Sequence, residues 1–147
     1  MNTPPGSRFN QKVRIRICGV LVESEKILLV RHQGLGILGW YWSPPGGGVE
    51  FGETTSRTLA REFKEETGLE VATGTFIQFH EHIDQRFHAL ELFFQVTRIS
   101  GTPILGTDPE LDGETPMLDA LEWFSRNDIA NLPEGSYHPA IPYFLGS

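Results

Sequence analysis

The stretch Gly47–Leu69, GGVEFGETTSRTLAREFKEETGL, decides the fold because it joins a glycine turn to the start and the end of a helix. Pro44–Gly48, PPGGG, is incompatible with a helix interior or a central strand. The oxygen-bearing side chains of Glu53–Ser56 can accept hydrogen bonds from the first amides of a helix, and Gly68 suits its left-handed end. The stretch therefore predicts a loop followed directly by a helix.

Two faces of this predicted helix differ in chemistry. Leu59 and Phe63 lie four residues apart on an apolar stripe, whereas Glu62, Glu65 and Glu66 project from one neighbourhood of the surface. Like charges at this spacing destabilise a helix by about 0.2–0.5 kcal/mol per pair. Two interpretations stay open: a solvated acidic face, or a site in which a divalent cation such as Mg²⁺ removes the repulsion. The adjacent glycine turn favours the cation, because it can direct a bare carbonyl at the same ion.

The spacing of these residues resembles the Nudix box of the MutT/Nudix hydrolases, G-x5-E-x7-R-E-U-x-E-E-x-G-U, where U is a bulky aliphatic or similar residue. Every fixed position is filled: Gly47, Glu53, Arg61, Glu62, Phe63, Glu65, Glu66, Gly68 and Leu69. The one departure is Phe63, which stands where an aliphatic residue is usual. Nine fixed positions across 23 residues make a far more specific signal than a lone glycine motif.

The resemblance implies a hydrolase that uses Mg²⁺, with Mn²⁺ as an alternative ion. It would cleave a diphosphate linkage in a nucleoside diphosphate joined to another moiety and release a nucleoside monophosphate. Bound ions would screen the phosphate charge, lower the pKa of bound water and polarise the bridging group. Nucleoside triphosphates and nucleotide sugars stay open as substrates. A catalytically inactive, nucleotide-sensing module is the alternative function, and the complete carboxylate set argues against it.

Carried onto this chain, the family pattern implies three glutamates and one backbone carbonyl as metal ligands. Glu62 and Glu66 are the first choices, and Glu65 would be a further ligand, directly or through water. The carbonyl of Gly46 would be the ligand that is not a carboxylate. The general base is left open between the box and a later loop, and the candidates are Glu65, Glu110 and Glu114, with Asp108, Asp112 and Asp119 as further acids.

Glu53 and Arg61 are predicted to form a structural ion pair that ties the loop to the helix, because the planar fork of arginine suits a carboxylate. Histidines outside the box suggest zinc only weakly, since no cysteine partner accompanies them, and surface or substrate-side positions are favoured. The other side chains considered for substrate contact are His80, His82, His88, Arg14, Arg16, Arg31 and His32. Trp40 and Trp42 could stack on a base, although a core or rim position is favoured.

Composition narrows the class of protein. The 147 residues carry a formal charge of −7 and are 39% hydrophobic, which predicts one globular domain and argues against a broad nucleic-acid surface. The single Cys18 allows no internal disulfide. The chain has no apolar run of membrane-spanning length, and its first ten residues are too polar for a signal peptide, so a cytoplasmic location is expected. The expected partner is a small nucleotide, and the resemblance allows a homodimer.

Alternating apolar residues predict several strands around the helix: Val13–Val22, Lys26–His32, Leu69–Ile83, Phe87–Ile99 and Ala120–Ser125. The first two are expected to pair as a hairpin, and short helical segments are expected after Ser125 and over 139–145. This order predicts one α/β domain with a mixed sheet, and the resemblance implies the Nudix α/β/α sandwich. Residues 1–11 are expected to be a flexible lead-in and residues 12–147 the domain.

Overall fold

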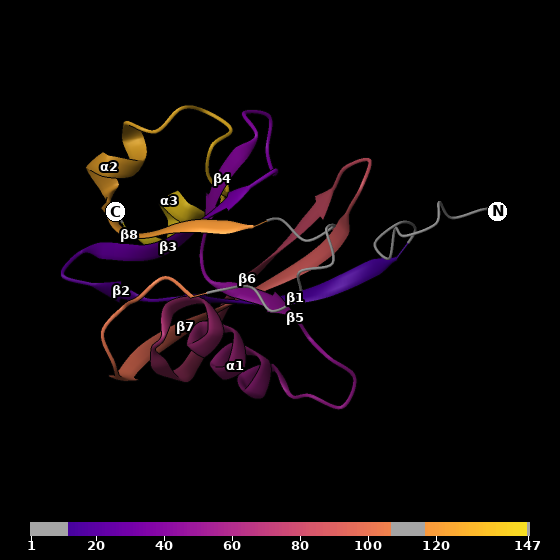
Figure 1. Ribbon diagram of the computed structural model, residues 1–147, viewed down its shortest axis with the longest axis vertical. Helices are drawn as coiled ribbons and strands as arrows, with labels where there is room; N and C mark the ends of the chain where they lie inside the picture. The colour runs from indigo at the N-terminus through magenta and orange to yellow at the C-terminus, as the bar shows by residue number, and fades with distance from the viewer. Residues whose placement is uncertain (1–11, 107–116, 147) are drawn as a thin grey trace.

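The computed structural model describes residues 12–106 and 117–146 (Figure 1). The predicted lead-in therefore lies outside the described residues, and so do the candidate acids of the later loop. The elements in chain order are β1 (Val13–Val20), β2 (Val22–Glu23), β3 (Lys26–Gln33), β4 (Trp40–Ser43), β5 (Gly46–Gly48), α1 (Thr55–Thr67), β6 (Glu70–Ile83), β7 (His88–Ser100), β8 (Leu118–Ser125), α2 (Arg126–Ala130) and α3 (Ile141–Phe144). Within the described ranges, no helix has the length and apolar character needed to cross a membrane.

Two sheets form the centre of the molecule. The first has the order β5-β1-β7-β6, in which β1 and β7 run parallel and the other neighbours run antiparallel. The second is antiparallel, with β3 between β4 and β8 and the short β2 paired to one end of β3. Helix α1 covers one side of the first sheet, and the second sheet with α2 and α3 lies on the other side (Figure 1). The predicted α/β fold around a mixed sheet is confirmed.

The predicted hairpin between the first two long strands is wrong for most of its length. Strand β1 pairs with β5 and β7, and only the two residues of β2 pair with β3 across Ser24 and Glu25. Alternate residues of β1 are buried on opposite faces, Ile17 towards α1 and Cys18 towards the second sheet. A strand buried on both faces belongs inside a sheet, and local turn residues do not reveal which strands become its neighbours.

Helix α1 begins and ends where the sequence predicts. The Thr54 side chain accepts a hydrogen bond from the Arg57 amide at 3.2 Å, and Gly68 closes the helix with a φ of 75°. Leu59 and Phe63 are fully buried against the first sheet. Trp42 is buried between the sheets and packs against Phe124, so the favoured core position of this tryptophan is confirmed.

A glycine in β1 accommodates the aromatic ring at the unusual position of the box. A Cβ atom at Gly19 would lie 3.0 Å from Leu59 Cδ1 and closer still to the ring of Phe63. We expect Gly19→Ala to lower the free energy of unfolding by about 1–3 kcal/mol, because the packed core has no room for the methyl group. Thermal and urea denaturation measure this change.

The double variant Gly19→Ala/Phe63→Leu provides the control, because a smaller side chain at position 63 makes room for the methyl group. The two substitutions are expected to destabilise the protein by less than the sum of their separate effects. Additive effects would show that Gly19 is not complementary to the ring.

Candidate metal and substrate site

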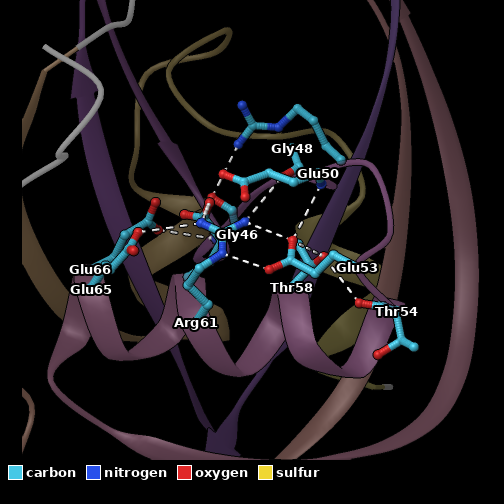
Figure 2. A network of polar contacts seen from close by, with 11 residues as sticks. Gly46, Gly48, Glu50, Glu53, Thr54, Thr58, Arg61, Glu65 and Glu66 are labelled. Atoms are coloured by element: carbon cyan, nitrogen blue, oxygen red, sulfur yellow. Dashed lines mark hydrogen bonds and ion pairs between the residues drawn. The ribbon is translucent and has the colours of Figure 1, made fainter.

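Three elements meet at the acidic cluster that the sequence predicts. Glu62 and Glu66 project from α1 and are only 8% and 5% exposed, while the Glu65 side chain is 31% exposed. The backbone amide of Gly46 in β5 donates a hydrogen bond to Glu66 Oε1 at 3.1 Å. Figure 2 shows Glu65 and Glu66 reaching from the helix towards Gly46. The helix and the glycine segment therefore meet, as the sequence suggests. The predicted loop is wrong for Gly46–Gly48, which form the edge strand β5 because their backbone pairs with β1.

The glycines of β5 are needed for this close approach. A Cβ atom at Gly47 would collide with the carboxylate of Glu62, and one at Gly46 would collide with the backbone of β1. Only residues without a side chain allow the acidic face of α1 to lie directly on the strand. The Gly46 carbonyl oxygen lies 3.5 Å from Arg16 Nη2, so a cation also approaches this oxygen from β1.

Arg61 connects the loop, the helix and the acidic cluster. Its Nε and Nη2 atoms donate to the two oxygens of Glu53 at 2.8 and 2.9 Å, which confirms the predicted ion pair (Figure 2). The sequence did not predict its other contacts, which are with Glu62 Oε1 at 2.8 Å, the Gly48 carbonyl at 3.3 Å and Glu65 Oε2 at 3.6 Å. Hydrogen bonds from Arg61 and Thr58 lower the pKa of Glu53 to about 2, so this carboxylate stays ionised.

The ionised form of Glu62 is disfavoured, although the positive charge of Arg61 lies next to it. Burial raises the pKa of the Glu62 carboxyl, the neighbouring charge of Glu65 raises it further, and Arg61 offsets only part of this. A divalent cation among these oxygens would stabilise the ionised form. Buried carboxylates beside bare backbone also match the oxygen ligands that Mg²⁺ prefers, so the residues present fit the ion that the family resemblance implies.

A cavity of about 570 Å³ extends from the acidic cluster along one face of the first sheet. This volume suits a nucleotide-sized ligand. Arg14 and Arg16 from β1 line it next to the acids, so these two arginines do lie at the site. Loop residues such as Leu35, Ile37 and Phe87 provide apolar walls. The cavity thus has an acidic end, a basic floor and apolar sides.

The remaining predicted residues are divided between the cavity and other surfaces. His32 lines the cavity, where burial lowers the pKa of its ring to about 3 and keeps it neutral. Arg31 instead donates to Asp119 at 2.8 Å and lies over the ring of Trp42. Asp119 is thereby engaged with β3 and does not line the cavity. Glu110 and Glu114 lie outside the described residues, as do Asp108 and Asp112.

The three histidines considered for zinc do not converge. His82 pairs with Asp84, and His88 pairs with Glu81. His80 instead contacts Glu91, which also accepts a hydrogen bond from the buried His138 at 2.8 Å. Sequence reasoning missed both Glu91 and His138, because they lie 47 residues apart on different elements and belong to no motif. Glu91 carried one signal, a charged residue between the apolar residues Leu90 and Leu92.

The family model and the similar proteins agree with one another. The family model described as "NUDIX domain" matches residues 11–144. An ADP-ribose pyrophosphatase of Methanocaldococcus jannaschii is 31% identical over 120 residues, which are 80% of this chain and 65% of that protein. The chain therefore spans slightly less than two thirds of that relative. An 8-oxo-dGTP diphosphatase of Proteus vulgaris is 31% identical over 80 residues, covering 54% of this chain and 71% of that protein.

Solved structures agree on the architecture. A MutT NUDIX hydrolase from Burkholderia pseudomallei superposes with a TM-score of 0.69 at 26% identity, over 92% of this chain and 97% of that one. A structure titled UDP-X diphosphatase superposes with a TM-score of 0.66 over 97% of this chain and 64% of that one. Its 20% identity supports likeness of fold alone.

Proposed function

The chain belongs to the NUDIX domain family, and on that premise we propose that it hydrolyses a diphosphate linkage in a nucleoside diphosphate derivative and releases a nucleoside monophosphate. The observation that supports this most directly is the buried pair Glu62 and Glu66 against the bare backbone of β5. The relatives named as ADP-ribose pyrophosphatase and 8-oxo-dGTP diphosphatase support a pyrophosphohydrolase. Their different substrates leave the identity of the derivative open.

We assign the roles residue by residue. Glu62, Glu66 and the Gly46 carbonyl would hold Mg²⁺, or Mn²⁺ as the alternative, with Glu65 as a further ligand. The bound ion would supply screening of the phosphate charge and a more acidic water. Arg61 holds Glu62 in place through its 2.8 Å contact, while Arg14 on the cavity floor would bind phosphate oxygens.

The general base that takes the proton of the attacking water is proposed to be a carboxylate close to the ion. Glu65 is the candidate within the described residues, and its partial exposure places it at the cavity surface. Glu110 and Glu114 remain candidates from the loop outside those residues. Each of the three glutamates is replaced in turn by glutamine, and kcat is measured across pH. The variant whose pH–rate profile loses its acidic limb identifies the base. Unchanged turnover in all three variants would remove this proposal.

An assay with several substrate classes tests the function. Nucleoside triphosphates, nucleotide sugars, ADP-ribose and dinucleotides are incubated with Mg²⁺ and with Mn²⁺, and the products are separated by chromatography. Release of a nucleoside monophosphate that stops on chelation is the expected result. Tight binding without turnover for every class would favour the inactive sensing module instead. The homodimer that the family resemblance allows is tested separately by sedimentation. A cytoplasmic location remains a prediction.

Metal binding should stabilise the protein, and more strongly at high pH. Because the pKa of Glu62 is raised, the folded state holds this proton more tightly than the unfolded state does, and the carboxyl disfavours folding as pH rises through its pKa. Mg²⁺ needs the ionised form. We therefore expect Mg²⁺ to raise the Tm by several degrees at pH 8, since about 2.7 kcal/mol is gained at 100 times the Kd.

At pH 5 a smaller rise in Tm is expected, because the raised pKa of Glu62 lets protons compete with Mg²⁺ for its carboxylate. Thermal scans with Mg²⁺ and with EDTA at both pH values measure the difference. An equal shift at both pH values would show that Glu62 does not hold the ion.

A further inference from the structure

Beside the acidic cluster the cavity is lined by a second charged group, Arg16, Glu91 and His138, and His80 contacts Glu91 from β6. Arg16 in β1 and Glu91 in β7 are paired positions of the parallel register, so their side chains share one face of the sheet. No direct ion pair joins them among the contacts of the described residues. Arg16 Nη2 turns to the Gly46 carbonyl, and its Nε atom is buried without a hydrogen-bond partner in the described structure.

Glu91 is held with one oxygen occupied and the other available. Its Oε1 atom accepts hydrogen bonds from His138 Nε2 at 2.8 Å and from His80 Nδ1 at 3.2 Å. None of its contacts with the described residues involves Oε2, and Glu91 lines the cavity. Burial alone would raise the pKa of Glu91, yet the His138 hydrogen bond and the Arg16 charge lower it to about 2. The cavity therefore contains a fixed, ionised acceptor.

The same three side chains could suggest a metal site, because their ligand atoms lie within 4.8 Å of one another. The backbone argues against it. The amide of Ala140 donates to His138 Nδ1 at 3.0 Å, so Nδ1 carries no proton. In a neutral ring the proton is then on Nε2, which donates it to Glu91 and has no lone pair for a metal. The two histidines therefore hold the Glu91 carboxylate in one orientation and do not bind a metal.

We propose that Glu91 and Arg16 form a subsite that selects guanine as the base of the substrate. Guanine presents two adjacent donors, N1–H and the 2-amino group, which can share the Oε2 atom of Glu91, and its O6 and N7 acceptors match a guanidinium. Adenine would place the acceptor N1 against Glu91, and uracil offers one N–H between two carbonyl oxygens. Of these bases, guanine complements both charges.

The position of Arg16 indicates the direction in which a bound nucleotide would lie in the cavity. Strand β1 lies between β5, whose Gly46 amide contacts Glu66, and β7, which carries Glu91, so Arg16 stands between the acidic cluster and Glu91. With the base at Glu91, the phosphates extend towards the acidic cluster. The inference thus rests on the proposed function for the direction of the substrate, but recognition of the base requires no turnover.

Binding of GMP and IMP tests the proposal, because the two ligands differ only by the 2-amino group. Calorimetry with saturating Mg²⁺ and with EDTA should show GMP binding about tenfold more tightly than IMP in both conditions, the effect of one charge-assisted hydrogen bond. AMP and UMP should bind more weakly than IMP. If the wild-type protein does not bind GMP more tightly than IMP, AMP and UMP, the proposal is wrong, and no variant is needed to show this.

Glu91→Gln should reduce the preference for GMP over IMP to about twofold or less, because the amide offers one acceptor and no charge. Glu81→Gln is the matched control: Glu81 also pairs with a histidine, but it lies on the opposite face of the sheet. A GMP preference that survives in Glu91→Gln overturns the assignment of this residue. Absent hydrolysis with an intact GMP preference would contradict the proposed function alone.

Discussion

Replacing Glu66 with glutamine is expected to lower kcat about 10³-fold while the protein stays folded. Glu66 is buried, and its Oε1 atom already accepts the Gly46 amide, a bond that the oxygen of glutamine can keep. The substitution therefore removes the charge at the proposed metal site and little else. Changes to residues that only support a metal ligand already reduce activity 10–100-fold, so loss of a direct ligand should exceed that range. Glu62→Gln should behave in the same way.

Steady-state kinetics and calorimetric titration with Mg²⁺ measure the two consequences separately. Glu70→Gln is the control, because Glu70 lies in β6 after the helix, pairs with the exposed Lys64 and is itself well exposed. It should keep wild-type turnover and Mg²⁺ affinity. If Glu66→Gln binds Mg²⁺ as tightly as the wild type, the metal is held elsewhere.

Removing Arg61 is expected to affect both stability and catalysis. Arg61→Met leaves the buried Glu62 and the loop residue Glu53 without their guanidinium partner. A fully buried pair broken in this way costs about 3–5 kcal/mol, but the Arg61 side chain is 26% exposed, so we expect about 1–3 kcal/mol. Turnover should fall about 10–100-fold, because Glu62 loses the contact that orients it. Arg61→Lys should rescue little, since a single ammonium cannot bind both Glu53 oxygens.

The pH dependence of stability gives this variant a distinct signature. The pKa of Glu53 is lowered to about 2 in the folded protein, against about 4.3 in an unfolded chain. Its stabilising contribution is therefore complete above about pH 4.3 and is lost as pH falls towards 2. Arg61→Met should flatten this acid limb in urea denaturation curves. Arg57→Met, an exposed arginine on the same helix, is the control and should leave the curve unchanged. An unchanged acid limb in Arg61→Met would show that Arg61 does not set the pKa of Glu53.

The helix and its acidic face were predictable because the interactions that form them are local. Thr54 and Gly68 cap the helix within a few residues of the positions they satisfy. The four-residue spacing of Leu59 and Phe63 places both towards the core whatever lies beneath. The acidic cluster follows from the same periodicity, so its existence needed no knowledge of the sheets.

Strand pairing was not predictable in the same way. Alternation along β1 shows which residues share a face, but it does not distinguish β3 from β7 as the neighbour. The parallel pairing of β1 with β7 places Arg16 opposite Glu91. Folding of the C-terminal segment then brings His138 to Glu91 across 47 residues.

By itself, the sequence determined the family motif, the helix that carries it, and the acidic residues proposed to hold a metal. These depend on spacing within one short segment, where backbone geometry alone sets the direction of each side chain. Only the tertiary structure decided the basic floor of the cavity, the oriented carboxylate of Glu91 and the space that Gly19 leaves for Phe63. Each of these joins residues that are distant in sequence, and their contact depends on the packing of whole strands rather than on any local pattern.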